Sequence, residues 1–502
     1  MKRFGILVLL VAVMTAGLFA QQRTTQSFFD LCAKGSREQV TSAIQAGAKV
    51  NGTTGLTASL LSLIAARNES VKARFDETGN QNQSPGGIAG DTPLMFAAAF
   101  NDDVGVISVL LKNGADPRHS DADGLTAIDA AAMNNSNPDV VMLLAKAAGG
   151  INSPDASGGS SLFVAAGFNP NPRVLTALIN DGAVLNQVDP DSGMTALGAA
   201  AAFNYNPEVM RLLLADGANV NALNKNGQSP LMAASALATN PQGIQQLLAN
   251  GANVNAQSND GTTALIAAVK SNRNPAIIAT LLKAGADVNE ANKNARTPLM
   301  LEVENADDMT IIEKLVAAGA NVSHQDYGGE SVLDDAIDQA ADAKASLDKA
   351  RYYGIPEGWV KVSDLSEYQS EYDEASTVVD YLIKHGANIE QRDLVGCTPL
   401  MASVYPDSRP RDAGPSALPD IVKELLAAGA NVNDRDADGT TALMYAAMSQ
   451  ARGEEDVIQL LLSAHADVKL KDGTGKTAWD FAQHNPKLKD TPAYWALNNA
   501  RF

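Results

Sequence analysis

Residues 193–226 read GMTALGAAAAFNYNPEVMRLLLADGANVNALNKN, and they contain the start and end signals of one complete helix pair. It begins with a run of small residues around Ala199, which favours a helix that a neighbouring backbone can approach closely. Asn206-Pro207 marks a new helix start, because Asn caps helix N-termini and Pro is favoured at the first helical position. Gly217 supplies the left-handed residue that ends this second helix. The polar residues that follow predict an extended arm with a turn.

The same helix end recurs along the whole chain. Ten copies carry Gly followed by Ala or Gly, and an eleventh carries His465, a residue type that tolerates the left-handed region. The glycines are Gly47, Gly114, Gly149, Gly182, Gly217, Gly251, Gly285, Gly319, Gly386 and Gly429. From Gly217 to Gly319 the step is 34 residues each time. A fixed period of this size is typical of a solenoid, in which each unit buries its apolar face only against its neighbours.

Two short motifs recur at fixed places in this period. Thr-Pro-Leu or Thr-Ala-Leu opens the first helix at residues 92–94, 263–265, 297–299, 398–400 and 441–443, and Gly-Ala-Asn-Val-Asn closes the second at residues 217–221, 251–255 and 429–433. In these motifs the chain resembles the ankyrin-repeat family over roughly residues 28–502, with about twelve units. The resemblance implies an all-α solenoid of stacked helix pairs with short β-hairpin arms at right angles to them. It also implies a non-enzymatic protein that binds a protein partner through its concave face and hairpin tips.

The chain departs from the family pattern in two respects. The family usually places His after Thr-Pro-Leu, where the ring hydrogen-bonds between units, and this chain has other residues there. They are Met95, Asp129, Phe163, Gly198, Met232, Ile266, Met300, Asp334, Met401, Met444 and Asp480. Softer side-chain packing is therefore expected to replace that polar network. The period is also one residue longer than the usual length of about 33, and the extra residue falls before the Asn-Pro cap.

The repeat predicts a single solenoid over residues 21–502, with a truncated capping unit at 475–502. Three insertions interrupt it, at about residues 68–90, 340–372 and 405–419. Insertions in a solenoid fall in loops on one face, which is often the binding face.

The middle insertion is the richest in aromatic residues. Helical patterns over 334–351 and 366–384 predict one unit whose two helices are extended and protrude as a hairpin. This hairpin carries Tyr352, Tyr353, Trp359, Tyr368 and Tyr372. Tyr and Trp are favoured anchors at interfaces, and a protruding hairpin also needs a small core of its own. Both interpretations stay open from the sequence.

Polar residues at the arm turns are further candidates for partner contacts. They are Arg118, Asp123, Asn224, Asn259, Asp326 and Arg435. The net charge of −19 argues against nucleic acid and anionic lipid as partners, because both reward Lys and Arg. An acidic surface serves solubility or a basic protein partner.

Residues 1–20 have the layout of a secretory signal peptide. Lys2 and Arg3 precede an apolar run over residues 6–13, and small residues near Ala20 offer a cleavage site. The run is shorter than the roughly 20 apolar residues that a membrane span needs, so a cleaved leader is favoured over an N-terminal anchor. We therefore expect a periplasmic or secreted protein, monomeric and without a membrane span after cleavage.

The sequence supports no catalytic, cofactor or metal site. Cys32 and Cys397 lie about nine units apart, too far to pair across helices that pack ~8–10 Å apart. Residues 473–477 resemble a phosphate-binding loop but lack its first Gly, and the five histidines follow no ligand spacing. Asp- and Gly-rich stretches that resemble calcium loops fit turns better; they are residues 121–124, 189–193 and 434–439.

The sequence thus predicts a protein-interaction scaffold without enzymatic activity. Two alternatives fit the same features. One is a structural or protective component of the cell envelope that holds many clients, as a chaperone does. The other is a secreted effector directed at a host protein.

Overall fold

The computed structural model describes two compact units, which divide the chain between residues 286 and 287. The described residues are 28–51, 90–121, 124–152, 159–239, 241–305, 309–352, 362–404, 417–449 and 454–501. The expected leader over 1–20, nearly all of the first insertion and residues 405–416 of the third lie outside this part of the chain.

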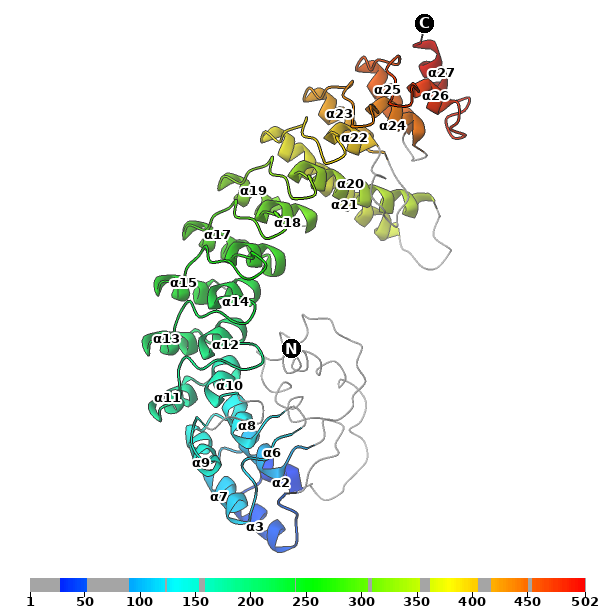
Figure 1. Cartoon of the computed structure of the whole chain (residues 1–502). Helices are drawn as coiled ribbons and strands as arrows, with labels where there is room; N and C mark the ends of the chain where they lie inside the picture. Colours follow the sequence, from blue (N-terminus) through cyan, green and yellow to red (C-terminus); the bar gives the residue numbers. More distant parts are fainter. Residues whose placement is uncertain are drawn as a thin grey trace. The chain divides into compact units, whose positions relative to one another are not determined.

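In the first unit, the first helix of each repeat packs on the first helix of the next, and the second helices form a row beside them (Figure 1). The first helices are α2 (Phe28–Lys34), α6 (Pro93–Phe100), α8 (Ala127–Asn134), α10 (Ser161–Phe168), α12 (Ala196–Phe203), α14 (Pro230–Leu237) and α16 (Ala264–Ala267), which continues into the π-helix η1 (Ala268–Asn272). The second helices are α3 (Arg37–Gln45), α7 (Val104–Lys112), α9 (Pro138–Ala148), α11 (Pro172–Asn180), α13 (Pro207–Ala215), α15 (Gln242–Ala249) and α17 (Pro275–Lys283).

The second unit repeats this arrangement with one enlarged helix pair. Its first helices are α18 (Pro298–Asn305), α20 (Val332–Tyr352), α22 (Pro399–Val404), α24 (Ala442–Met448) and α26 (Ala478–Ala482). Its second helices are α19 (Met309–Ala317), α21 (Val362–Lys384), α23 (Pro419–Ala427), α25 (Glu454–Ser463) and α27 (Pro492–Asn499). The enlarged pair is α20, with 21 residues, packed on α21, with 23. Because residues 52–89 are not described, the number of repeats in the chain stays a prediction.

The local signals in residues 193–226 act as predicted. The Thr195 hydroxyl accepts a hydrogen bond from the Gly198 N–H and starts α12, whose small residues are buried along nearly its whole length. The Asn206 side chain accepts from the Glu208 N–H and starts α13. All ten repeat-ending glycines have positive φ, Gly217 at 90°. Capping and helix termination therefore follow from the sequence alone.

The arms between repeats are turns rather than the expected β-hairpins. Across the described ranges no strand forms, and isolated antiparallel bridges join Val188 with Thr195 and Gln325 with Ser331. In the turns at Asn224, Asp326 and Asp436, the first residue donates its N–H to the backbone carbonyl four residues on, and its side chain accepts the N–H of that same residue. The fold is therefore helical throughout the part of the chain that the structure describes.

In five of the described repeats, an asparagine in the segment that lengthens the period ties the repeat to the one before it. The Asn169 amide group donates to the carbonyls of Ala132 (2.9 Å) and Asn135 (3.0 Å), and its oxygen accepts from the Asn171 N–H (2.9 Å). Equivalent bonds are made by Asn101, Asn135, Asn204 and Asn485. The longer period thus contributes hydrogen bonds between repeats.

A second asparagine, at the last position of the Gly-Ala-Asn-Val-Asn motif, ties several of the described repeats to the next one. The Asn221 amide group donates to the Gly251 carbonyl (3.1 Å), and its oxygen accepts from the Asn253 N–H (2.9 Å). The same pair of bonds is made by Asn51, Asn152 and Asn289. These bonds explain why the motif recurs, since each copy holds the helix end of its neighbour.

The position after Thr-Pro-Leu is buried where Met, Asp129 or Asp334 occupies it, and half-buried at Asp480. Met95, Met232, Met300, Met401 and Met444 are all buried in the core, which confirms the expected packing role. Asp129 instead accepts from the Thr126 N–H (3.0 Å) and hydroxyl (2.8 Å). Asp334 and Asp480 do the same with Ser331 and Thr477. In those repeats the carboxylate completes a helix cap.

Candidate functional site

The arm tips share one turn geometry. In residues 436–440 the Asp436 carboxylate accepts from the N–H groups of Asp438 (2.9 Å) and Thr440 (2.8 Å), and Gly439 has a φ of 77°. The same two bonds form at Asn224, Asn292, Asp326, Asp393 and Asp472. The first side chain of the turn thus accepts hydrogen bonds from its own turn, and the one or two residues after it form the tip of the arm.

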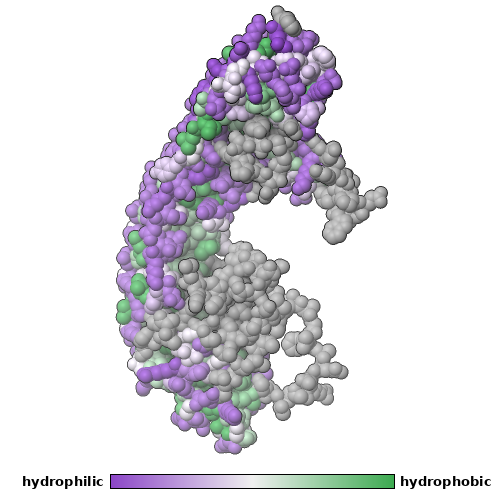
Figure 2. Space-filling view, turned by 45° about the vertical axis from the view of Figure 1, so that its right-hand side comes forward, coloured by the Kyte–Doolittle hydropathy of each residue, from purple (hydrophilic) through white to green (hydrophobic). Residues whose placement is uncertain are grey.

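Two tips differ from the others in carrying large apolar side chains. Tyr327 is 77 % exposed, and in the next arm Leu394 and Val395 are 76 % and 55 % exposed. Other tips are polar or small: Lys225-Asn226, Asn259-Asp260, Lys293-Asn294, Ala437-Asp438 and Gly473-Thr474. The described surface in Figure 2 is largely hydrophilic, with small, separate apolar patches. We call Tyr327, Leu394 and Val395 the tip patch.

The two apolar tips are neighbours in space although they lie far apart in the sequence. The Gln325 amide group donates both to the Gly329 carbonyl of its own turn (2.8 Å) and to the Arg392 carbonyl of the next arm (2.9 Å). A Cβ added at Gly329 would lie 3.0 Å from the Leu394 N atom. Helices α20 and α21 occupy the chain between these arms. The three apolar side chains of the tip patch therefore stand on two adjacent arms.

Beside the tip patch, one arginine is surrounded by four carboxylates. The Arg296 guanidinium lies 3.0 Å from Asp335, 3.2 Å from Glu304, 3.4 Å from Asp326 and 3.9 Å from Glu330. Burial raises the pKa of Asp335 to about 8 despite Arg296, and the three other carboxylates add to the increase. The network joins two arms to the end of α18 and the start of α20.

A family model described as ankyrin repeats (3 copies) matches residues 31–155, 162–258, 235–326 and 412–499, which is more than half of the chain. The chain belongs to the ankyrin-repeat family. Ankyrin repeats are generally protein–protein interaction modules, and proteins built from them are typically non-enzymatic scaffolds. No curated protein sequence matches the chain.

Sequence reasoning did not single out the tip patch. The sequence contained the signal, because aligning the ankyrin repeats by their period places the residues before each arm glycine at equivalent positions. In that alignment Tyr327 and the pair Leu394-Val395 stand out as the large apolar residues. Their adjacency was hidden by the insertion that separates the two arms.

Three of the predicted polar residues hold the ankyrin arms together. Asn259 donates to a backbone carbonyl of the preceding arm (3.0 Å), and Arg118 donates to the Ala148 carbonyl (2.8 Å). Arg435 donates to the Gly439 carbonyl of its own turn (3.1 Å) and to a carbonyl of the following arm. These contacts give the three side chains a structural role, and partner binding by them stays a prediction.

The remaining polar candidates belong to the turns themselves. Asn224 and Asp326 accept backbone N–H groups of their own turns, and Asp326 also faces Arg296. Asp123 lies outside the described residues.

The aromatic residues predicted in the inserted hairpin are described only in part. Tyr372 is buried; its hydroxyl donates to Asp420 on α23 (3.4 Å), and the Lys344 ammonium lies 5.2 Å from its ring centre. Burial raises the pKa of Tyr372 to about 12. Tyr368 is partly exposed. The Tyr352 side chain and residues Tyr353 and Trp359 lie outside the described part. Tyr372 therefore packs as hairpin core, and the binding role of the group is a prediction.

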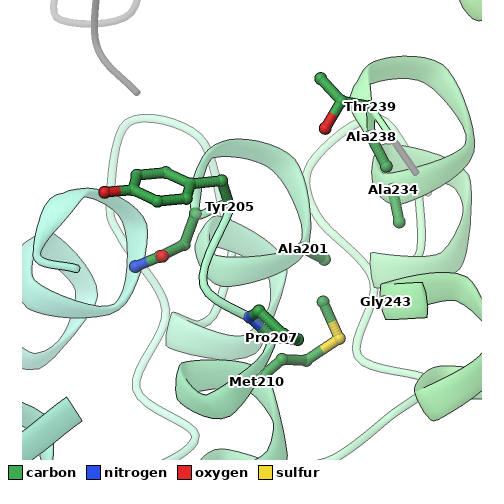
Figure 3. Close-up of a pocket in the computed structure, with 9 residues that line it drawn as sticks. Ala201, Tyr205, Pro207, Met210, Ala234, Ala238, Thr239 and Gly243 are labelled. Atoms are coloured by element: carbon green, nitrogen blue, oxygen red, sulfur yellow. The ribbon is translucent and has the colours of Figure 1, made fainter. Parts of the chain in front are cut away.

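A small pocket lies between two repeats of the first unit (Figure 3). Its volume is about 30 Å³, enough for one or two water molecules. It is lined by Ala201, Asn204, Tyr205, Pro207, Met210, Ala234, Ala238, Thr239 and Gly243. This volume is too small for a metabolite or cofactor.

The described segments contain no group of three His, Cys, Asp or Glu side chains placed to hold a metal ion. At the calcium-like stretch, one oxygen of Asp436 accepts from its own turn and the other accepts from the Tyr445 hydroxyl (2.5 Å). Within the same segments, no helix combines the length and the apolar character needed to cross a bilayer.

Proposed function

We propose that this ankyrin-repeat protein is a non-enzymatic scaffold that binds a protein partner through its arm tips and the expected concave face, with the tip patch at the centre. The observation that carries the proposal is the exposure of Tyr327, Leu394 and Val395 on two adjacent arms. Single exposed apolar residues are normal on a protein surface, whereas three large ones on two adjacent arms with otherwise polar turns favour an interaction site.

The turn geometry suits such a role. Tyr buries a large area on binding and keeps a polar hydroxyl, which makes it a favoured anchor at interfaces. Asp393 accepts from the N–H groups of Val395 (2.9 Å) and Cys397 (2.8 Å), so the backbone under the apolar tip is already held in place. A preformed surface loses less conformational entropy when it binds.

Affinity capture from the native envelope tests the proposal with the full chain and two matched variants. Leu394→Asp places a charge in the tip patch, and Leu223→Asp makes the same change at a leucine of the first unit that is 54 % exposed. We expect Leu394→Asp to weaken capture of the partner at least about tenfold, and Leu223→Asp to leave it unchanged. Equal capture by all three proteins would exclude the tip patch as the binding surface.

We also propose that the protein is exported and that residues 1–20 are removed as a leader. The support is the basic start followed by a short apolar run and small residues. Fractionation of the source cells, with mass spectrometry of the N-terminal peptide, checks this. We expect a mature N-terminus near residue 21 in the periplasm or the medium, and an intact Met1 in the cytoplasm would contradict it.

A further inference from the structure

The tip patch lies in a negatively charged environment. Asp326 and Glu330 belong to the same turn as Tyr327, and both face Arg296 together with Glu304 and Asp335. Asp335 stays protonated at neutral pH, and one guanidinium offsets only part of the charge that Glu304, Asp326 and Glu330 carry. Glu304 keeps 53 % of its side chain exposed and Glu330, in the same turn as Tyr327, keeps 27 %, so the negative potential of this network reaches the solvent.

The basic residue on the second apolar tip does not reverse this potential. The Arg392 guanidinium donates to the carbonyls of Gly396 (2.9 Å) and Arg435 (2.6 Å) and pairs with Asp434 at 2.7 Å. Its charge is therefore matched by a carboxylate within the same pair of arms. Lys293, on the arm before Tyr327, is exposed, and its single charge together with Arg296 does not balance Glu304, Asp326 and Glu330.

We propose that the tip patch recognises a segment of its protein partner in which an apolar side chain stands within a few residues of Lys or Arg. The apolar side chain packs against Tyr327, Leu394 and Val395, and the cation lies near Glu330 and Glu304. This inference rests on the proposed function and adds the chemistry of the partner. Charge complementarity of this kind sets specificity and association rate more than affinity.

A second copy of the chain is a poor occupant for this surface. The chain carries a net charge of −19, so a second copy brings the same sign of charge to carboxylates that already outnumber their arginine. Like charges across an interface disfavour binding. The charge balance thus favours a different, basic segment over self-association.

Selection from a display library of random peptides of about twelve residues, with the full chain as the immobilised target, tests the inference. We expect the enriched peptides to combine an apolar residue with Lys or Arg at a spacing of a few positions. Their binding to the wild-type chain is expected to weaken as the salt concentration rises, because salt screens the charge pairs.

Two variants separate the apolar contribution from the charge contribution. Leu394→Asp is expected to lose binding of the enriched peptides at least about tenfold. The double variant Glu304→Gln/Glu330→Gln leaves Asp326 and Asp335 on Arg296, and is expected to weaken binding at least about fivefold with a smaller salt dependence. Glu455→Gln/Asp456→Asn, which removes two exposed charges from α25, is the matched control and is expected to bind normally.

The possible outcomes distinguish this inference from the proposed function. Enriched peptides that depend on Leu394 but carry no excess of Lys or Arg would overturn the inference and leave the tip patch as a binding surface. Enriched peptides that bind Leu394→Asp as well as the wild type would overturn both. A selection without enrichment would also overturn the inference, and envelope capture would then decide on the proposed function alone. Circular dichroism of each variant verifies that it is folded.

Discussion

Backbone conformation at single residues decides where the repeat needs Gly. His465 occupies the helix-ending position that Gly fills elsewhere, and its φ is 63°. The left-handed region costs a residue with a Cβ about 1–2 kcal/mol, and part of this is offset because Gly makes the unfolded chain more flexible. We therefore expect His465→Gly to stabilise the chain by about 0.5–1 kcal/mol, measured as a higher midpoint of urea unfolding.

Gly217→Ala is the reverse change in the same structural position. Gly217 has a φ of 90°, and an added Cβ would meet no atom within 4 Å. Any loss of stability therefore measures backbone strain less the unfolded-chain entropy that Ala removes, without a steric clash. If neither substitution moved the unfolding midpoint, the argument from φ would be wrong.

Asp335 predicts a pH dependence of stability. Burial raises the pKa of Asp335 from its ordinary value of 3.8 to about 8 in the folded chain. Between these values the folded state holds a proton that the unfolded state has lost, so this residue makes stability fall as pH rises from about 4 to about 8. Glu454, with a pKa raised by burial to about 7, acts in the same direction.

Asp335→Asn removes this contribution and leaves three carboxylates on Arg296. We expect the variant to gain thermal stability relative to the wild type at pH 8, and to gain less or none at pH 5. Scanning calorimetry of both proteins across this range measures the difference. A variant that is less stable by the same amount at both pH values would show that the ion pair with Arg296 outweighs burial.

Among the helix pairs, one repeat lacks the asparagine that bonds to the repeat before it, and the small pocket lies at that position. Ala238 occupies the position of Asn135 and Asn169, and its backbone has the same extended conformation. By the register of those residues, an Asn at 238 reaches the carbonyls of Ala201 and Asn204, which line the pocket.

Ala238→Asn is therefore expected to fill this pocket and to stabilise the chain by about 1 kcal/mol, the net value of one or two hydrogen bonds. Thermal unfolding measures the change. Asn169→Ala is the matched loss, and it is expected to cost about 1–3 kcal/mol because it leaves buried carbonyls without their donor. A destabilising Ala238→Asn would contradict the proposed register.

The sequence predicted those elements whose causes are local. Thr195, Asn206 and Gly217 act within a few residues of themselves, so their capping and terminating roles were readable from the pattern. The hydrogen bonds of Asn169 could not be read from the pattern, because its acceptors lie 34 and 37 residues away. The β-hairpin arms were an expectation from the family resemblance; the turns predicted from the polar residues are present, and no strands flank them within the described ranges.

At the scale of the molecule, the period predicted the family, and the family does not determine the site. The repeat-wide features fix stacking and caps, whereas the tip patch arises from three residues that depart from the common tip pattern. Tyr327 and Leu394 are 67 residues apart, and only the packing of their arms joins them. Departures from a repeat's average are thus the positions to examine for function.

The two cysteines lie in different compact units, so the accessibility of each thiol measures the unfolding of one unit. Cys32 lies on α2 in the first unit and Cys397 lies just before α22 in the second, and both are buried without forming a disulfide. Burial raises the pKa of Cys32 to about 12 and that of Cys397 to about 11. At neutral pH both therefore stay protonated and inert towards alkylating reagents while the chain is folded. Alkylation then requires local unfolding.

In a solenoid each repeat is stabilised mainly by its neighbours, so the two thiols should become accessible at different urea concentrations. Helix α2 packs on the first helix of one described neighbour, α6, whereas α22 packs on both α20 and α24. We therefore expect Cys32 to be alkylated at a lower urea concentration than Cys397, measured by mass spectrometry of the two peptides after short pulses of iodoacetamide. Alkylation of both at one urea concentration would show a chain that unfolds in a single cooperative step, and earlier alkylation of Cys397 would contradict the argument from neighbours.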